Sequence, residues 1–311
     1  MHSDCTHAAC HPAPPPWRSL PVCFPGDATV QVEGKGQLTM EQLRPGHRVL
    51  SVGWDGKLRY EEVYMFTRAD RSAVGQYSRI SALSLDGTGQ PTTHELRLSP
   101  FHYTTSGADP SSTCAALAAA SAPAGASDKD GTLLAAWHAA AQHLDFAGNH
   151  IMKLPTEVSP GMVAWLADPA DASGRATPAC ITAVNATLEN GAFSPFVRAR
   201  GIVVDGVVAS PHVRWGYVWG RLWLPAAVNP YVPAVMEALL TPFWLAYKVL
   251  GPRLTWRILQ HPIFGSWDMG NIIVGNLAVW GQAAAALLAA VAVARHRRRV
   301  RLAAAAKCKC E

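Results

Sequence analysis

The sequence predicts an all-β domain made of two similar halves, followed by an aromatic-rich helical segment and a transmembrane helix. Three observations support this fold class. Strand-like alternation recurs between residues 23 and 213, tryptophans concentrate after residue 214, and residues 269–294 contain no charged side chain. A chain of 311 residues is long enough for about two domains, or for one domain with extensions.

The first segment, residues 1–22, is expected to be disordered because its "HPAPPP" run cannot build a core. It lacks the basic and apolar regions of a signal peptide, so none is predicted. The run "CTHAACH" at residues 5–11 has metal-binding residue types but no second ligand pair, so we predict no metal site. The seven cysteines are odd in number and irregular in spacing, which implies no disulfide framework.

Strand patterns begin directly after this segment. Pro25-Gly26 is a turn signal, and the alternating residues Ala28, Val30 and Val32 follow it as in a half-buried strand. Further on, "HRVLSVGWDGKLRYEEVYMF" contains two strand-like runs joined by the hairpin signal Trp54-Asp55-Gly56. "HELRLSPFHY" is another alternating run, so residues 23–105 are expected to form the first β half.

A second β half is indicated by a short internal repeat. "QLRPGHRV" at residues 42–49 is echoed by "EVSPGMVA" at residues 157–164, and each copy has Pro-Gly before an apolar strand start. Two copies of one β unit would give a pseudo-two-fold domain. Between the halves, residues 106–148 are rich in Ala, Ser and Gly and are interpreted as a low-complexity insert ending in one short helix.

The C-terminal third has a different character. Seven of the eleven tryptophans lie between Trp215 and Trp280, a density typical of a membrane–water interface. We therefore assign residues 214–268 to a membrane- or lipid-associated segment; within it, residues 232–251 fit either a core helix or an interfacial helix. The charge-free run 269–294 is long enough to span a bilayer, which takes about 20 residues.

Charge is distributed unevenly along the chain. The formal net charge is +5, but residues 295–311 alone contain five Arg, two Lys and one Glu, so the rest of the chain is nearly neutral. A neutral body does not indicate a nucleic-acid surface, and we expect no nucleic-acid partner. The basic tail directly follows the predicted span, as expected for a cytoplasmic flank. The preceding β domain is therefore expected on the extracytoplasmic side.

The motifs Cys23-Phe24-Pro25-Gly26, "MEQLRPGHRV" from Met40 and "LSPFH" at residues 98–102 occur in one order. With them the chain resembles the self-processing Hint domain, specifically the C-terminal domain of hedgehog proteins. The resemblance covers residues 23–213, interrupted by the insert, and implies a Hint fold. No hedgehog signalling domain is expected before Cys23, because only residues 1–22 precede it.

The resemblance also implies a reaction and its residues. Cys23 would attack the carbonyl carbon of Val22 and convert the amide into a thioester. The family's Thr-x-x-His motif is matched by Ser99 and His102, so His102 is expected to protonate the departing amine while Ser99 polarises the scissile amide. No cofactor is implied.

The sequence departs from the family pattern at four points that bear on the expected reaction. Val22 stands where the family usually has a small residue, and its branched side chain would slow the attack by crowding. The family's activating acid is absent from the position after Phe66, leaving the slightly displaced Asp70 as the candidate. Pro211 occupies the place of a cysteine of animal hedgehog domains, and the missing terminal His-Asn pair argues against splicing.

Several functions therefore remain open. The thioester could be resolved by a membrane lipid alcohol such as a sterol, or by water; we favour the lipid narrowly. Alternatively, the chain is a catalytically degenerate Hint fold that serves as a membrane-anchored interaction module. A cysteine hydrolase acting on other molecules is disfavoured, because the nearest substrate of Cys23 is its own upstream bond.

Overall fold

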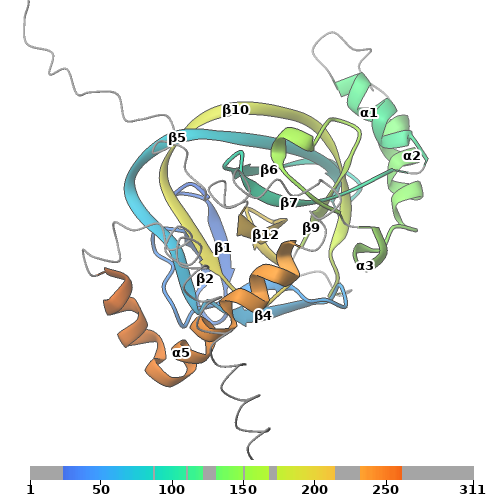
Figure 1. Cartoon of the computed structure of the whole chain (residues 1–311). Helices are drawn as coiled ribbons and strands as arrows, with labels where there is room; N and C mark the ends of the chain where they lie inside the picture. Colours follow the sequence, from blue (N-terminus) through green and yellow to red (C-terminus); the bar gives the residue numbers. More distant parts are fainter. Residues whose placement is uncertain are drawn as a thin grey trace, which may run out of the picture. The chain divides into compact units, whose positions relative to one another are not determined.

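The computed structural model describes residues 24–86, 88–109, 111–121, 131–149, 151–167, 174–213 and 232–260. These residues form a mostly-β structure whose strands join one curled sheet (Figure 1). The predicted β domain is thereby confirmed. Its strands are β1 (Thr29–Val32), β2 (Gly36–Thr39), β3 (Arg48–Val52), β4 (Leu58–Glu62), β5 (Met65–Leu85), β6 (Pro91–Leu98), β7 (His102–Gly107), β8 (Ile151–Lys153), β9 (Val163–Leu166), β10 (Thr177–Phe196), β11 (Gly201–Val204) and β12 (Val207–Val213).

Helical elements interrupt and follow the strands. They are α1 (Thr113–Ser121), α2 (Thr132–Ala141), α3 (Phe146–Asn149), the short 3₁₀ helix η1 (Pro155–Glu157) and α5 (Val232–Gln260). Helices α1 to α3 fall in the segment between β7 and β8, and α5 follows the last strand (Figure 1).

The first strands form where the sequence pattern placed them. In β1, Val30 and Val32 are buried while the residues between them are partly exposed. Strands β3 and β4 pair antiparallel, with Leu50 opposite Tyr60. The predicted Asp-Gly turn connects these two strands, and its Gly56 has the positive φ of 76° that such turns need.

Two long strands, β5 and β10, form the frame of the domain. They pair antiparallel over most of their length and arch together around the other strands (Figure 1). The pairing is interrupted by bulges after Ile181, Asn190 and Phe193. Because a bulge bends its strand and increases the twist, these irregularities allow the sheet to curl. The last two bulges follow Asn190 and Phe193, whose carbonyls accept the N–H groups of Gly26 and Phe24.

The repeat predicted from the sequence is present as two equivalent turns. Gly46 and Gly161 both have φ of 91°, and each precedes a short strand, β3 or β9. The Gly46 N–H donates to the Val63 carbonyl at 2.9 Å, and the Gly161 N–H donates to the Ile181 carbonyl at 2.8 Å. Each of these partners in turn donates its own N–H to the residue that follows the glycine. The two halves of the domain therefore share one local construction.

The interior contains two hydrophobic clusters. One lies within the curled sheet and includes Phe24, Phe66 and Phe193. The other lies under the segment between β7 and β8, where Trp137 of α2 packs with Trp165 of β9. Strand positions alone therefore do not account for the whole core.

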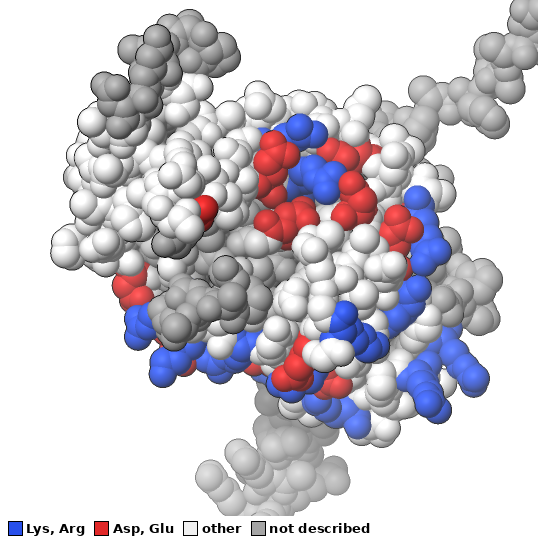
Figure 2. Space-filling view, turned by 180° about the vertical axis from the view of Figure 1, so that it is seen from behind, with Lys and Arg blue, Asp and Glu red and all other residues white. Residues whose placement is uncertain are grey.

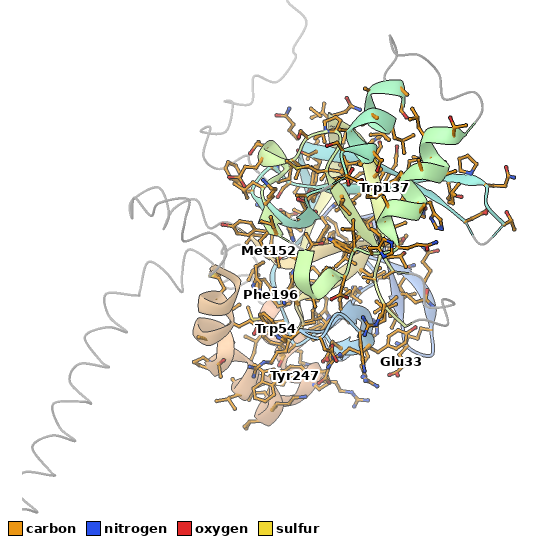
Figure 3. The ribbon with its side chains drawn as sticks, turned by 90° about the vertical axis from the view of Figure 1, so that its right-hand side faces the viewer. Glu33, Trp54, Trp137, Met152, Phe196 and Tyr247 are labelled. Carbon is orange, nitrogen blue, oxygen red and sulfur yellow. A yellow bond between two sulfur atoms is a disulfide. The ribbon has the colours of Figure 1, made fainter. Side chains whose placement is uncertain are left out.

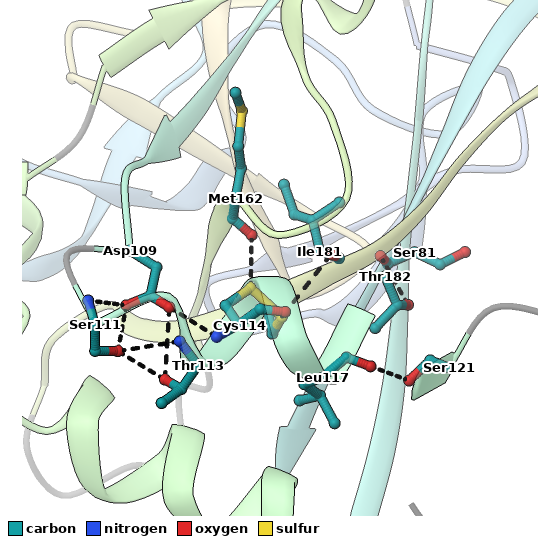
Figure 4. The surroundings of a disulfide bond; sticks show 11 residues. Ser81, Asp109, Ser111, Thr113, Cys114, Leu117, Ser121, Met162, Ile181 and Thr182 are labelled. Carbon is teal, nitrogen blue, oxygen red and sulfur yellow. Dashed lines mark hydrogen bonds between the residues drawn. A yellow bond between two sulfur atoms is a disulfide. The ribbon is translucent and has the colours of Figure 1, made fainter. Parts of the chain in front are cut away.

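The segment expected as an insert contributes to this second cluster. Leu117 of α1, Trp137 of α2 and Phe146 are each about 1% exposed. Cys114 forms a disulfide with Cys180 of β10, across a sequence separation of 66 residues (Figure 4). The irregular cysteine spacing did not predict this bond, which closes the segment onto the sheet.

Helix α5 packs against the turn before β3 and the start of β5. Its Trp256 contacts the Phe66 ring edge-on, with centroids 6.0 Å apart, and the Arg44 guanidinium lies 4.7 Å above the same indole. Lys248 forms an ion pair with Glu62 at 2.6 Å. The helix is kinked at Gly251, where φ is 75°.

The other side of α5 carries exposed apolar side chains. Leu245 and Val249 are 53% and 85% exposed, while Met236 and Leu240 are buried. No helix in the described ranges combines the length and apolar character needed to cross a bilayer. The predicted span 269–294 and the basic tail 295–311 lie outside these ranges.

Charged side chains of both signs are interspersed on the face shown in Figure 2. An ion-pair cluster joins distant parts of the sheet through Arg97, which lies 2.9 Å from Asp27 and 3.2 Å from Glu189. Asp205, in the turn between β11 and β12, is 3.9 Å from the same guanidinium and accepts two hydrogen bonds from Thr29. The cluster holds the first strand against the last hairpin.

Candidate active site

The first described residue, Phe24, is fixed on both sides. Its N–H donates to the Phe193 carbonyl at 2.8 Å, and the Phe193 N–H donates back to the Phe24 carbonyl at 2.9 Å. Its ring is fully buried and lies 4.2 Å, centroid to centroid, from the ring of His102. Both Val22 and Cys23 lie outside the described residues. The structure thus locates the residue that follows the predicted nucleophile.

The Pro25-Gly26 turn holds this position against β10. The Gly26 N–H donates to the Asn190 carbonyl at 2.8 Å. Next to it, Gly191 has φ of 81°, and a Cβ at this position would lie 2.8 Å from the Gly26 Cα. A side chain at residue 191 would therefore collide with the turn, so close backbone contact is a structural requirement here.

His102 is presented at the start of β7 by a tight turn. The Ser99 carbonyl accepts the His102 N–H at 3.0 Å, with Pro100 inside the turn. Proline suits this position because its φ is preset. Ser99 is fully buried beneath the turn. The Ser-x-x-His spacing is therefore the geometry of one β-turn that delivers the imidazole into the core.

The protonation state of His102 follows from its contacts. Its Nε2 lies 2.7 Å from the carbonyl oxygen of Ser210, which can only accept, so Nε2 carries the proton. Burial lowers the pKa of His102 to about 4, although the bond to Ser210 acts to raise it. The ring is therefore neutral at physiological pH, and Nδ1 has a free lone pair. Nδ1 is buried without a hydrogen-bond partner.

Asp70 is engaged elsewhere. Its backbone on β5 pairs with Ala192, and its carboxylate accepts the Ser72 N–H at 2.9 Å and the Ser72 hydroxyl at 2.8 Å. Partial burial acts to raise the pKa of Asp70, but the bonds from Ser72 and the nearby Arg68 hold it below its usual value. Among the described residues, its polar contacts are with Ser72 and Arg68, and none joins it to His102.

His212 is a further buried histidine that sequence reasoning missed. It lies on β12 and is 2% exposed, and its Nδ1 has no hydrogen-bond partner. Burial, together with the nearby His102, lowers the pKa of His212 to about 3. The two histidines lie on paired strands, with Val213 opposite His102. The available signal was a polar residue directly after Pro211 within an apolar strand. A proline inside a strand is typical of a bulge, where a side chain can be redirected.

The arrangement provides groups that can transfer protons. Within the described ranges, no group of three or more His, Cys, Asp or Glu side chains is placed to hold a metal ion. His102 lies next to Phe24, the residue that follows Cys23, and His212 lies on β12, which pairs with the start of β7 at His102. Both imidazoles are buried and neutral and offer proton acceptors. Such groups can take a proton from a thiol or hydroxyl and return it to a leaving group.

Comparisons with known proteins match this region. The family model described as the Hint module matches residues 16–216. The DnaX mini intein from Spirulina platensis shares 13% identity, with a TM-score of 0.37, over 60% of this chain and 98% of the intein. A DnaB intein from Synechocystis sp. PCC 6803 shares 11% identity, with a TM-score of 0.32, over 61% of this chain and 98% of the intein. The family model covers both histidines and the turn that follows Cys23.

Proposed function

The chain belongs to the Hint module family, and from that premise we propose that it cuts its own backbone between Val22 and Cys23. The product of the first step is a thioester that joins the Val22 carbonyl carbon to the Cys23 sulfur. The reaction is intramolecular and occurs once per chain. Proximity of this kind can supply about 7–11 kcal/mol of the barrier.

The observation that carries this proposal is the position of His102. Its ring lies against the ring of Phe24, the residue bonded to Cys23, at a tilt of 50°, and its Nδ1 is free to accept a proton. Nδ1 takes the thiol proton, and the Cys23 sulfur attacks the Val22 carbonyl carbon. The proton then passes to the Cys23 nitrogen as the C–N bond breaks. A histidine with a pKa of about 4 releases its proton readily, which suits delivery to a departing amine.

Ser99 has a supporting part in the same step. It lies fully buried in the turn that sets the direction of His102. In the proposed reaction its hydroxyl polarises the scissile amide. Ser99→Ala is therefore expected to slow cleavage less than loss of the imidazole.

The second step transfers the Val22 acyl group to an acceptor. We favour a membrane lipid alcohol of sterol type over water. Helix α5 supports this choice, because it packs on the domain while its other side exposes Leu245, Val249 and Leu254. Such a surface suits contact with the apolar part of a lipid.

Membrane anchoring completes the proposal. The charge-free run 269–294 would span the bilayer once, with the basic tail 295–311 in the cytosol. The disulfide between Cys114 and Cys180 supports an extracytoplasmic Hint domain, because disulfides persist in oxidising compartments. Protease protection of sealed membranes tests this: the tail should be cut from the cytosolic side while the Hint domain stays intact. A Hint domain digested from the cytosolic side contradicts the orientation.

Cleavage itself is tested by mass spectrometry of the purified full chain. Hydroxylamine should release the segment that ends at Val22 as a hydroxamate, and it leaves the disulfide unreduced. Cys23→Ala should abolish release, whereas Cys10→Ala, a cysteine of the same N-terminal segment, should not change it. If the Cys23→Ala chain is cut at the same bond, the nucleophile is wrong.

The acceptor is identified by a second mass measurement. After processing in vesicles with sterol, the released segment should gain the mass of one sterol less water. A free carboxylate at Val22 under these conditions contradicts lipid transfer and leaves hydrolysis. A wild-type chain that stays uncut with hydroxylamine supports the alternative, a degenerate Hint fold acting as an interaction module.

A further inference from the structure

The second step, attack of an acceptor on the thioester, needs a base that takes the acceptor's proton. Two of the residues considered so far, His102 and Asp70, are already engaged in other contacts. Water and alcohols are weak nucleophiles until a base takes their proton. The His102 Nε2 donates a hydrogen bond to the Ser210 carbonyl, and the ring lies next to Phe24. We have placed its Nδ1 in the proton transfer of the first step. The Asp70 carboxylate is bound by Ser72 and Arg68 on its own strand.

His212 is a buried histidine that has no role in the proposed first step. It sits in the irregular stretch of β12 between Ala209 and Val213, where pairing with β7 is interrupted. Its backbone N–H donates to the Ser210 hydroxyl at 3.0 Å, and the Ser210 carbonyl is the partner of His102. One short bulge therefore holds both imidazoles. The His212 Nδ1 is buried without a hydrogen-bond partner, so it is open to a proton from an incoming hydroxyl.

A row of aromatic rings leads from α5 to this histidine. The Tyr247 ring of α5 lies 6.5 Å from that of Tyr64, which lies 6.5 Å from that of Phe196. The Phe196 ring in turn lies 5.6 Å from that of His212. Figure 3 shows Phe196 and Tyr247 toward the same end of the domain, with Trp137 toward the other. Packed rings thus connect His212 to α5, whereas the ring next to His102 is that of Phe24.

We propose that His212 is the base that activates the acceptor hydroxyl in the second step, with the acceptor reaching it from the α5 side. This inference rests on the proposed self-cleavage. The His212 Nδ1 takes the proton of the acceptor O–H while that oxygen attacks the thioester carbonyl carbon. The C–S bond breaks, and the imidazolium returns the proton to the Cys23 thiolate. The low pKa of His212 keeps its ring neutral, so the lone pair is present before the acceptor arrives.

The two steps can be separated with one variant. Hydroxylamine needs no base to attack a thioester, whereas water and sterol do. His212→Gln should therefore keep wild-type cleavage with hydroxylamine but lose about 100-fold in the rate of release by water or sterol, so the thioester accumulates. The matched control is His94→Gln, a partly buried histidine of β6 that hydrogen-bonds Ser84. It should change neither rate.

Each outcome decides the question. Wild-type release by water and sterol in His212→Gln overturns the assignment. Equal loss of both reactions in a folded variant, checked by circular dichroism, also overturns it by placing His212 in the first step. If His212→Gln does not fold, His212→Asn is measured in the same way. Should both variants fail to fold, the wild-type chain decides: release by water that is no slower in D₂O overturns base catalysis. A wild-type chain uncut by hydroxylamine instead refutes the proposed self-cleavage.

Discussion

Acid should destabilise this domain through its two buried histidines. His102 and His212 are fully buried, and burial lowers their pKa values to about 4 and about 3. An unfolded histidine has a pKa of about 6.5. Between these values the unfolded chain binds protons that the folded chain does not, so stability falls as the pH falls. The loss begins below about pH 6.5 and continues until the folded rings protonate.

The size of this stability loss is set by how strongly the histidines bind protons in the unfolded chain. At about pH 5.5, one unit below the unfolded value, protonation of each histidine stabilises the unfolded chain by about 1.4 kcal/mol. Both folded rings are still neutral there, so the two together lower the free energy of unfolding by about 3 kcal/mol relative to about pH 8. This is a large part of the stability of a typical domain, which is about 5–15 kcal/mol.

Urea unfolding of the Cys23→Ala background, which cannot cleave, measures this loss at about pH 8 and about pH 5.5. His102→Gln and His212→Gln should each remove about half of the loss that we assign to the pair. The Cys23→Ala parent chain, measured at the same two pH values, is the reference for both variants. If both substitutions leave the wild-type pH dependence intact, the buried neutral pair is not its cause and the tautomer argument for His102 fails.

Three further predictions concern the first step and the frame of the site. His102→Ala should slow hydroxylamine release by about 100-fold, measured by intact mass over time; a wild-type rate contradicts general acid–base catalysis by this ring. Reduction of the Cys114–Cys180 disulfide, which closes a loop of 66 residues, should lower the free energy of unfolding by about 4 kcal/mol, and an unchanged urea midpoint would refute this. Gly191→Ala should cost at least about 1–2 kcal/mol, because φ is 81° and the new Cβ would lie 2.8 Å from Gly26; thermal unfolding several degrees lower than wild type checks this, and an unchanged melting temperature contradicts it.

Local patterns were enough to predict the strands and their turns. The alternation of Val30 and Val32, the Asp55-Gly56 hairpin and the repeated Pro-Gly turns all depend on neighbours a few residues apart, and all are present in the structure. The Ser-x-x-His spacing is local in the same sense, since it is one β-turn. Whether His102 is catalytic stays a prediction.

Long-range placement was not available from the same patterns. Cys114 and Cys180 are separated by 66 residues, and only the fold brings their Cα atoms to 5.4 Å. The low-complexity composition of residues 106–148 concealed helices whose side chains complete a core, because the apolar partners lie on distant strands. Asp70 lies near the family's acidic position in the sequence, but its own strand supplies the partners that hold its carboxylate.

The sequence by itself determined that this chain contains a Hint domain with a cysteine at its start and a histidine at the start of a later strand. Those features depend on the order and spacing of residues, which the sequence states directly. Only the tertiary structure decided that His102 and His212 both contact Ser210, that His102 lies beside Phe24, and that α5 lies at the end of an aromatic row leading to His212. The physical reason is that a curled sheet closes strands from both halves onto one interior. The environment of a buried imidazole is then set by residues that are remote along the chain.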